Sequence, residues 1–298
     1  MSRPPDTATR ILMLHRILDD QATAFGLPGC YRLRGTALTV DELSRLLDRV
    51  CPILPLDAVE SALADHRAPP PGAVLTFDDG YREHLDVVTP LLDARGATAT
   101  FYVASGLHGA GCEVSVVDAW YWLLDHARSP LARVPLPGGG EFRGRTDTLP
   151  GKQAWVMGEP KAALLAATPG QQQAMLAALA TEVRADLPGD LASQLYLGRE
   201  SWSELASRGM SLGAHSVHHP RLTQVDDTTL DHEVGASVDA LRLLDRAVPF
   251  AYPDGAYDDR VIAAVRRAGV SSAVTCEPGE AGLGSDLMRL PRFFVRPD

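Results

Sequence analysis

The chain has 298 residues, of which 45% are hydrophobic and 22% are charged. These fractions are close to those of ordinary globular proteins, and they exclude disordered, fibrous and collagen-like classes. The formal net charge is −10. Because such a chain is repelled by phosphate backbones and by anionic membrane surfaces, we do not expect nucleic acid as a partner.

No stretch of the sequence reaches the roughly 18 consecutive apolar residues that a membrane-spanning helix needs. The N-terminal apolar run Ile11–Leu14 is followed by His15 and is too short for a signal peptide. The cysteines lie far apart, in no zinc-binding or redox spacing. We therefore expect a cytoplasmic protein with reduced thiols and no membrane insertion.

Short apolar runs alternate with helical patterns, which is typical of strand–helix units around a parallel sheet. The expected strands are 10–14, 73–77, 98–103, 210–214, 248–252, 270–275 and 289–295. The expected helices are 41–50, 57–65, 84–95, 201–209, 227–245 and 258–268, and a capping box of Ser201 and Glu204 would open the fourth. Because barrels of such units reach about 250 residues as one domain, we expect a single barrel domain over residues 1–298.

The alternation breaks down between about residues 107 and 199. This stretch contains the aromatic cluster Trp120–Trp122, the turn-rich segment Leu136–Gly140 and an alanine- and glutamine-rich helical pattern around 171–186. We interpret it as a mostly helical insertion in the barrel. It could carry a wall of the substrate site or a contact in a homo-oligomer.

Polar residues follow four of the expected strands. His15 follows the first strand, Asp78 and Asp79 follow the second, His215 follows the strand after the insertion, and Tyr252–Gly255 follows the next. In parallel barrels the active site is built at the carboxyl ends of the strands. We therefore expect these residues to converge.

Two of these groups have the composition of a metal site. Asp78 and Asp79 would repel each other at a buried strand end unless a cation or a proton relieved them, although an isolated Asp-Asp-Gly more often caps a helix or lies in a solvated turn. One helical turn would put His215 and His219 on the same side, and His218 competes with His219 for this position. Two histidines and one carboxylate match hydrolytic metal sites that leave positions open for water.

Other histidines are less informative. A lone histidine such as His15 after an apolar strand is more often a satisfied core or rim residue than a catalytic one. The pair His232–Glu233 lacks the second histidine that a helical zinc-protease motif needs.

Three motifs taken together resemble a known family. Thr76–Gly80, His215–Leu222 and Phe250–Gly255 are similar to the first three motifs of the polysaccharide deacetylase family and occur in the family's order. The resemblance covers roughly residues 10–105 and 200–295. It implies an α/β fold, a distorted (β/α)7 barrel, and it outweighs the structural interpretations of the single residues.

The resemblance also implies the roles of the site residues. Asp79, His215 and His219 would hold a divalent metal, and Asp78 would be the catalytic base. A bound metal lowers the pKa of water, and a neighbouring carboxylate can take the proton. Zinc is the first expectation for this cofactor, and cobalt, nickel or manganese also suit the ligand set.

The loop Tyr252–Gly255 is expected to contact the reacting group. The backbone amide of Asp254 would hold the developing oxyanion, because Pro253 has no amide hydrogen. We expect Tyr252, Pro253 and Tyr81 to bind substrate.

The chain departs from the family's pattern in its general acid. Many members supply the proton for the leaving amine from a C-terminal Leu-x-His motif, but this chain has no histidine after His232. A branch of the family carries the acid in an N-terminal segment that Leu14–Arg16 resembles. His15 is therefore the expected acid.

A second departure concerns the arginine that orients the base. Many members place it where this chain has Ala251, and Arg289 or Arg292 could replace it from the last strand.

The expected function is hydrolysis of an N-acyl, and first an N-acetyl, amide on an amino sugar or a sugar-containing small molecule. The alternatives are a deformylase or cyclic imide hydrolase acting on a small amide, and a metal-binding pseudoenzyme. Retention of both Asp78 and Asp79 argues against the pseudoenzyme, because a binding module needs no base beside a metal ligand.

Overall fold

The computed structural model describes residues 8–19, 23–107, 114–242, 244 and 247–297. The chain forms two compact units. Unit 1 comprises Met1–Ile17, Val40–Glu113 and Ala192–Val295, and unit 2 comprises Leu18–Thr39, Val114–Leu191 and Arg296–Asp298. Among the residues described, every helix is too short or too polar to cross a lipid bilayer.

Unit 1 is built on an eight-stranded sheet whose neighbouring strands are parallel, as the alternation of strand and helix patterns predicts. The strand order is β11-β10-β9-β6-β5-β1-β12, and β4 pairs with β5. The strands are β1 (Thr9–Leu14), β4 (Ile53–Leu54), β5 (Gly72–Phe77), β6 (Thr100–Val103), β9 (Ser211–Ala214), β10 (Phe250–Ala251), β11 (Ala273–Val274) and β12 (Phe293–Phe294). This is a distorted (β/α)7 barrel, as expected.

The last segment of unit 1 connects the two edges of the sheet. Beside β11, the amide of Leu290 donates to the carbonyl of Ala273, and the amide of Thr275 donates to Leu290, both at 2.9 Å. A few residues later, β12 pairs with β1 on the opposite edge. Arg292 lies between these two pairings and is fully buried. The last segment of unit 1 therefore places the guanidinium of Arg292 in the interior of the barrel.

The central strands are buried on both faces, which explains their continuous apolar runs. Every residue of β5 is buried, and the hydroxyl of Thr76 donates to the carbonyl of Leu12 at 2.8 Å. β6 and β9 approach closely: a Cβ added at Gly213 would lie 2.4 Å from ring atoms of Tyr102. A glycine is needed there because the buried tyrosine ring fills the space of a side chain.

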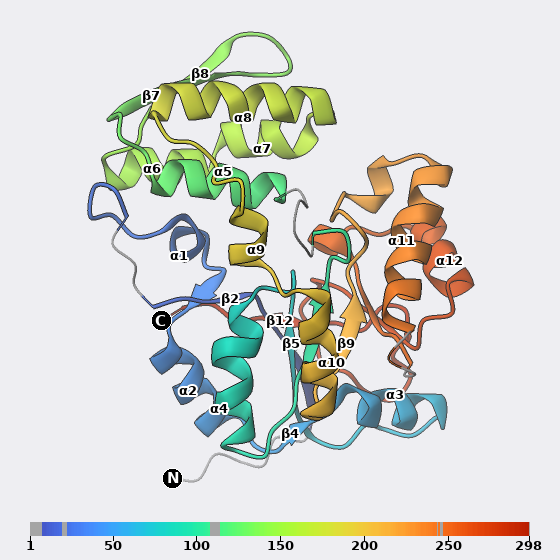
Figure 1. The fold of residues 1–298 in the computed structure, drawn as a ribbon. Coiled ribbons are helices and arrows are strands. Elements are labelled where there is room, and N and C mark those ends of the chain that lie inside the picture. The colour runs from blue at the N-terminus through green and yellow to red at the C-terminus, as the bar shows by residue number, and fades with distance from the viewer. Residues whose placement is uncertain (1–7, 20–22, 108–113, 243, 245–246, 298) are drawn as a thin grey trace. The chain divides into compact units, whose positions relative to one another are not determined.

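Helices lie on both sides of the strands of unit 1, with α2 and α4 on one side and α11 and α12 on the other (Figure 1). They are α2 (Val40–Arg49), α3 (Leu56–Ala64), α4 (Thr89–Asp93), α10 (Arg199–Ser207), α11 (Asp227–Arg242) and α12 (Asp259–Arg267). A π-helical turn, His84–Val88, precedes α4, and 3-10 turns occupy Leu222–Gln224 and Pro253–Gly255. The short strand β2 (Arg16–Ile17) follows β1.

One expected helix start was wrong, and one expected helix end falls outside the described residues. α10 begins at Arg199 with Gly198 as its N-cap, so Ser201 does not open it. Glu200 favours this earlier start, because an acidic side chain in the first turn stabilises the positive end of the helix dipole. The helix expected over 227–245 ends at Arg242, and positions 243 and 245 lie outside the described residues.

Unit 2 is mostly helical, and the sequence did not indicate that residues 18–39 belong to it. Its elements are α1 (Cys30–Arg34), β3 (Ala37–Leu38), α5 (Val116–Asp125), β7 (Leu131–Pro135), β8 (Glu141–Arg145), α6 (Leu149–Met157), α7 (Glu159–Ala166) and α8 (Pro169–Val183), while α9 (Leu191–Leu195) spans the boundary between the units. The turn-rich segment 136–140 connects β7 and β8 in an antiparallel hairpin. The buried rings of Trp120 and Trp155 lie in its core, with centroids 5.7 Å apart.

Candidate metal centre and surrounding site

Three side chains from two strand ends meet in unit 1. Asp79 follows β5, and His215 and His219 lie in the loop after β9. The Asp79 Oδ1 atom lies 3.6 Å from His215 Nε2 and 3.5 Å from His219 Nε2. The two Nε2 atoms are 3.1 Å apart. One ligand atom from each residue therefore faces a common point.

These separations fit a metal ion. With metal–ligand bonds of about 2.0–2.1 Å, the edges of a tetrahedron measure roughly 3.3–3.4 Å. The three observed separations, from 3.1 to 3.6 Å, lie around this value. Two imidazoles and a carboxylate also leave coordination positions for water and substrate, as in hydrolytic sites. Both the donor set and its geometry therefore suit a divalent ion.

The buried environment holds His215 in the form that binds metals. Its Nδ1 donates to the carbonyl of Ala251 at 2.7 Å, which leaves the lone pair of Nε2 directed at the cluster. Burial, with a smaller contribution from neighbouring His219, lowers the pKa of His215 to about 4. The imidazole is therefore neutral near pH 7. Ala251 contributes its backbone carbonyl to the site.

The loop that carries the two histidines is irregular. The sequence suggested a helical turn, but Ser216 and His219 adopt left-handed backbone conformations, with φ of 62° and 59°. The hydroxyl of Ser216 accepts the amide hydrogen of His219 at 2.9 Å. His218 turns away and pairs with Glu233, and its side chain is 56% exposed. The cluster therefore contains His219 and not His218.

Asp78 lies beside this cluster in a buried ion pair. Its Oδ1 and Oδ2 atoms lie 2.7 and 2.8 Å from Nη1 and Nη2 of Arg292. The guanidinium also donates to the carbonyl of Thr275 and to the hydroxyl of Thr76. Burial alone would raise the pKa of Asp78, but the Arg292 charge lowers it well below its ordinary value, with smaller contributions from His215 and from the hydrogen bonds that Arg292 donates. The carboxylate is thus ionised and fixed in orientation.

The structure distinguishes the two arginines that the sequence left open. Arg292 binds Asp78 in the barrel interior, whereas Arg289 pairs with the exposed Asp259 at 3.1 Å. Spacing alone did not separate them. The signal that could have done so is the alternation along the segment before β12, because residues two positions apart share a side and the apolar Leu290 is buried like Arg292.

His15 stands at the end of β1, where its ring packs edge-on against Phe294 with centroids 5.6 Å apart. Its charge is among the smaller influences that lower the pKa of Asp78. Its backbone carbonyl accepts a hydrogen bond from Nε2 of buried His84 at 2.8 Å. Among the described residues, no group is hydrogen-bonded to the buried Nδ1 of His15. The ring is therefore held by packing, and its buried Nδ1 has no hydrogen-bond partner among the described residues.

Only part of the loop after β10 is exposed to solvent. Tyr252 is fully buried, and its hydroxyl donates to the carbonyl of Met288 at 2.9 Å, while Pro253 is also buried. Asp254 is exposed, has a φ of 54°, and pairs with Arg221 through its carboxylate at 2.9 Å. The substrate-binding roles of Tyr252 and Pro253 therefore stay predictions, and the accessible residue of this loop is Asp254.

Tyr81, the other expected substrate contact, is 3% exposed. Its ring stacks on Tyr196 with centroids 5.8 Å apart, and the guanidinium carbon of Arg16 lies 4.1 Å from the ring centroid. Arg16 is itself paired with Glu83. This arrangement fixes the chain next to His15, and substrate contact by Tyr81 stays a prediction.

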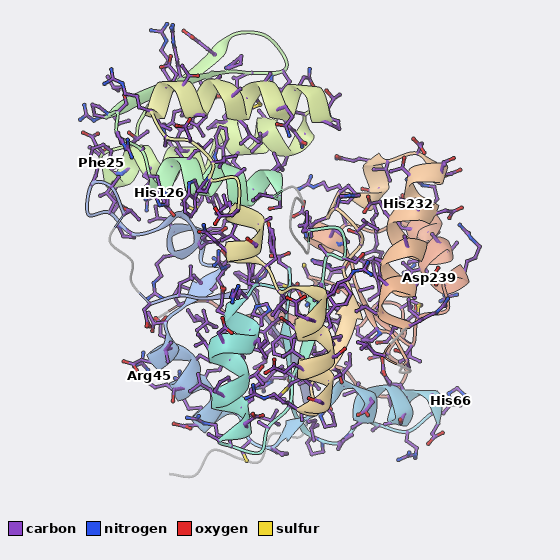
Figure 2. The ribbon with its side chains drawn as sticks, in the orientation of Figure 1. Phe25, Arg45, His66, His126, His232 and Asp239 are labelled. Carbon is purple, nitrogen blue, oxygen red and sulfur yellow. The ribbon has the colours of Figure 1, made fainter. Side chains whose placement is uncertain are left out.

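Three other histidines, His66, His126 and His232, are exposed and are labelled in Figure 2. None of them belongs to the cluster of potential ligands found in the described chain.

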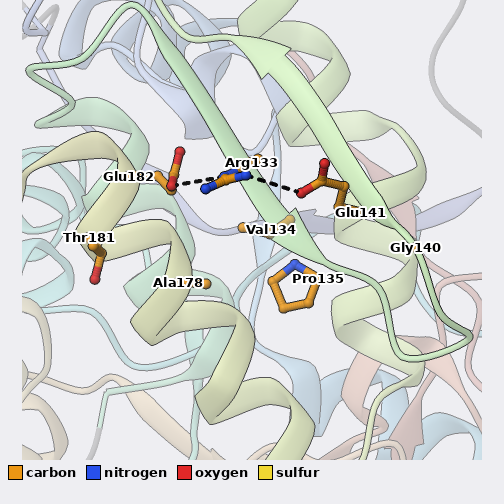
Figure 3. Close-up of a pocket in the computed structure, with 8 residues that line it drawn as sticks. All are labelled: Arg133, Val134, Pro135, Gly140, Glu141, Ala178, Thr181 and Glu182. Carbon is orange, nitrogen blue, oxygen red and sulfur yellow. Dashed lines mark hydrogen bonds and ion pairs between the residues drawn. The ribbon is translucent and has the colours of Figure 1, made fainter.

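Unit 2 has a separate hollow of about 500 Å³ between hairpin β7–β8 and α8 (Figure 3). Arg133 on its wall pairs with Glu182 at 3.1 Å and approaches Glu141 at 3.8 Å. No residue expected in the site lines it. Arg133 is therefore shared between two carboxylates of the same hollow.

Comparison with known proteins supports the resemblance found in the motifs. The family model described as Polysaccharide deacetylase matches residues 65–121 and 175–273. These stretches contain Asp78, Asp79, His215 and His219. The chain belongs to the polysaccharide deacetylase family. His15 and Arg292 lie outside the matched stretches.

A curated relative and several solved structures are also similar. YxkH of Bacillus subtilis (strain 168), whose name assigns it to the polysaccharide deacetylases, is 26% identical over 107 residues, which are 34% of this chain and 37% of YxkH. The Streptococcus pyogenes deacetylase PplD, solved in complex with acetate, matches with a TM-score of 0.63 and 20% identity, covering 98% of this chain and 93% of that one. The deacetylase domain of BpsB from Bordetella bronchiseptica matches with a TM-score of 0.60 and 16% identity, over 100% and 99% of the two chains. At these identities the solved structures show that the fold is shared.

Proposed function

We propose that the chain hydrolyses the N-acetyl amide of an amino sugar in a reaction that depends on a divalent metal, with zinc as the first expectation. The observation that carries this proposal is an ionised, buried carboxylate, Asp78, directly before Asp79 in the sequence. Asp79 belongs to a cluster whose three ligand atoms suit a tetrahedral ion. Membership of the polysaccharide deacetylase family supports both the reaction and the class of substrate.

Asp79, His215 and His219 would hold the ion. When bound there, it would polarise the amide carbonyl and acidify water. Asp78 is the base that accepts a proton from the attacking water. Arg292 keeps this carboxylate ionised and directs its oxygens through two hydrogen bonds. A new C–O bond then forms at the carbonyl carbon, and negative charge develops on the carbonyl oxygen.

The backbone amide of Asp254, in the loop after β10, would stabilise this charge. The left-handed conformation of Asp254 and its exposure at the carboxyl end of the strand support this role. His15, from the end of β1, would donate the proton to the departing nitrogen as the C–N bond breaks. The products are a carboxylate and a free amine. The Nδ1 of His15, which has no hydrogen-bond partner among the described residues, supports its assignment as the acid.

The test is release of amine from a panel of N-acetylated and N-formylated amino sugars, their short oligomers and a cyclic imide. Metal-reconstituted protein and the Asp78→Asn variant are compared at equal metal content. Release of acetate and amine by the wild type, abolished in Asp78→Asn, would support the proposal. Turnover of only formyl or imide substrates would replace the acetyl assignment, and metal binding with no turnover of any substrate would favour a pseudoenzyme.

A further inference from the structure

The loop between the two histidines of the cluster is held by a buried carboxylate from α11. Oε2 of Glu233 accepts hydrogen bonds from the backbone amides of Val217 and His218, each at 2.8 Å. Its Oε1 lies 2.7 Å from Nδ1 of His218. The side chain of Glu233 is only 5% exposed. One carboxylate therefore binds three groups that lie between His215 and His219.

The opposite side of the same loop is fixed by the end of β6. The amide of Ser105 donates to the carbonyl of Ser216 at 3.0 Å, and the amide of Gly106 donates to the carbonyl of Val217 at 2.8 Å. A Cβ at Gly106 would lie 2.5 Å from a side-chain carbon of Val217. The loop is thus enclosed between the strand end and Glu233.

The backbone of this loop needs such support. Ser216 and His219 have φ of 62° and 59°, a region that residues with a Cβ enter at a cost in energy. Such conformations persist where surrounding contacts determine them. The two amides that Glu233 binds lie between these two residues, so their hydrogen bonds favour the turn that brings Nε2 of His219 to 3.1 Å from Nε2 of His215.

We propose that Glu233 is a positioning residue that preorganises His215 and His219 for the metal ion. The inference rests on the proposed function, since it concerns the ion that the cluster would hold. Groups that orient metal ligands without touching the metal influence affinity strongly. Glu233 does so through the backbone of the ligand loop, and it also keeps the ring of His218 on its own carboxylate and out of the cluster.

The test is a titration of metal-free protein with Co²⁺, whose absorption spectrum reports both affinity and coordination geometry. Wild type is compared with Glu233→Ala, Glu233→Gln and Glu233→Asp at a temperature where circular dichroism shows each variant to be folded. The matched control is Asp239→Asn, which removes a charge from the exposed face of α11, where Asp239 pairs with Arg242 (Figure 2).

Glu233→Ala should weaken Co²⁺ binding by about 10–100-fold and alter the spectrum, because mutations of such supporting groups have effects of this size. Asp239→Asn should leave both unchanged. Glutamine keeps the length of the side chain and an oxygen for the two amides, whereas aspartate keeps the charge but falls short of them. The positioning role therefore predicts that Glu233→Gln binds more tightly than Glu233→Asp, and this order carries the test if Glu233→Ala does not fold.

Unchanged affinity and spectrum in a folded Glu233→Ala would overturn the inference while leaving the metal centre standing. Tighter binding by Glu233→Asp than by Glu233→Gln would also overturn it, since long-range charge would then matter more than the hydrogen bonds. Absence of Co²⁺ binding by the wild type itself would instead remove the metal centre of the proposed function, and this inference with it.

Discussion

Replacing Arg292 with methionine tests the ion pair that holds Asp78 inside the barrel. The two residues share hydrogen bonds of 2.7 and 2.8 Å, and their side chains are 0% and 4% exposed. Methionine fills much of the same space but leaves the carboxylate charge buried and unpaired. Removing one partner of such a pair costs about 3–5 kcal/mol, so the free energy of unfolding should fall by this amount.

The assay is urea unfolding of the metal-free protein, followed by circular dichroism. Arg289→Met is the matched control, because Arg289 lies in the same segment but pairs with an exposed residue, Asp259. This variant should change stability much less. The double variant Asp78→Asn/Arg292→Met should be more stable than the sum of the two single effects predicts, since no charge is then left buried. Equal destabilisation by the two arginine variants, or strict additivity in the double variant, would refute this reasoning.

Three further predictions address catalysis, pH dependence and packing. Asp78→Asn should lower kcat by about 10²–10⁴-fold with metal content intact, measured as acetate release, and a smaller loss would remove Asp78 as the base. Burial lowers the pKa of His84, so the wild type should lose stability relative to His84→Gln as the pH falls below about 6.5. The loss should be at most about 1.4 kcal/mol per pH unit, measured by unfolding titrations at several pH values. A pH-independent difference would contradict it. Gly213→Ala should destabilise the protein by about 1–3 kcal/mol, because its Cβ would lie 2.4 Å from the ring of Tyr102; unchanged stability would show that the ring can move.

The pH prediction follows from the protonation state of His84. Its Nε2 donates to the carbonyl of His15, which requires the hydrogen on that atom and leaves Nδ1 without one in the neutral ring. Charging the ring must overcome burial, while the neighbouring charges of Glu83 and Asp79 favour protonation and that of Arg16 opposes it. The unfolded chain therefore takes up the proton first as the pH falls, and protonation favours unfolding.

Most of the barrel could be predicted from the sequence, because buried parallel strands produce continuous apolar runs and helices end at glycines. The expected strand 73–77 corresponds to β5, and the helix expected over 258–268 corresponds to α12, which Gly269 follows with a φ of 72°. The sequence does not indicate the hairpin of unit 2, because exposed positions of β7 carry the apolar residues Leu131 and Pro135, which hides the regular alternation of burial along the strand. Residues 18–39 belong to unit 2 through tertiary contacts that no local pattern encodes.

The convergence of Asp79, His215 and His219 followed from their places after parallel strands. Their local geometry did not, because the loop of His215 reaches the cluster through left-handed residues and not through a helical turn. The sequence does not indicate the role of Glu233, because the pair His232–Glu233 suggests only an incomplete helical zinc-protease motif. Its partners lie 15 and 16 residues earlier in the chain, in another element, and only the packing of α11 brings them together.

The most direct test of the central claim is acetate release measured against the number of metal ions bound per chain. Metal-free protein is titrated with zinc, bound metal is counted by mass spectrometry, and His219→Gln is titrated alongside. The account predicts that activity rises linearly to one ion per chain and then stays constant, with weakened binding and little activity in the variant. Full activity without metal, or an unchanged titration of His219→Gln, would contradict it.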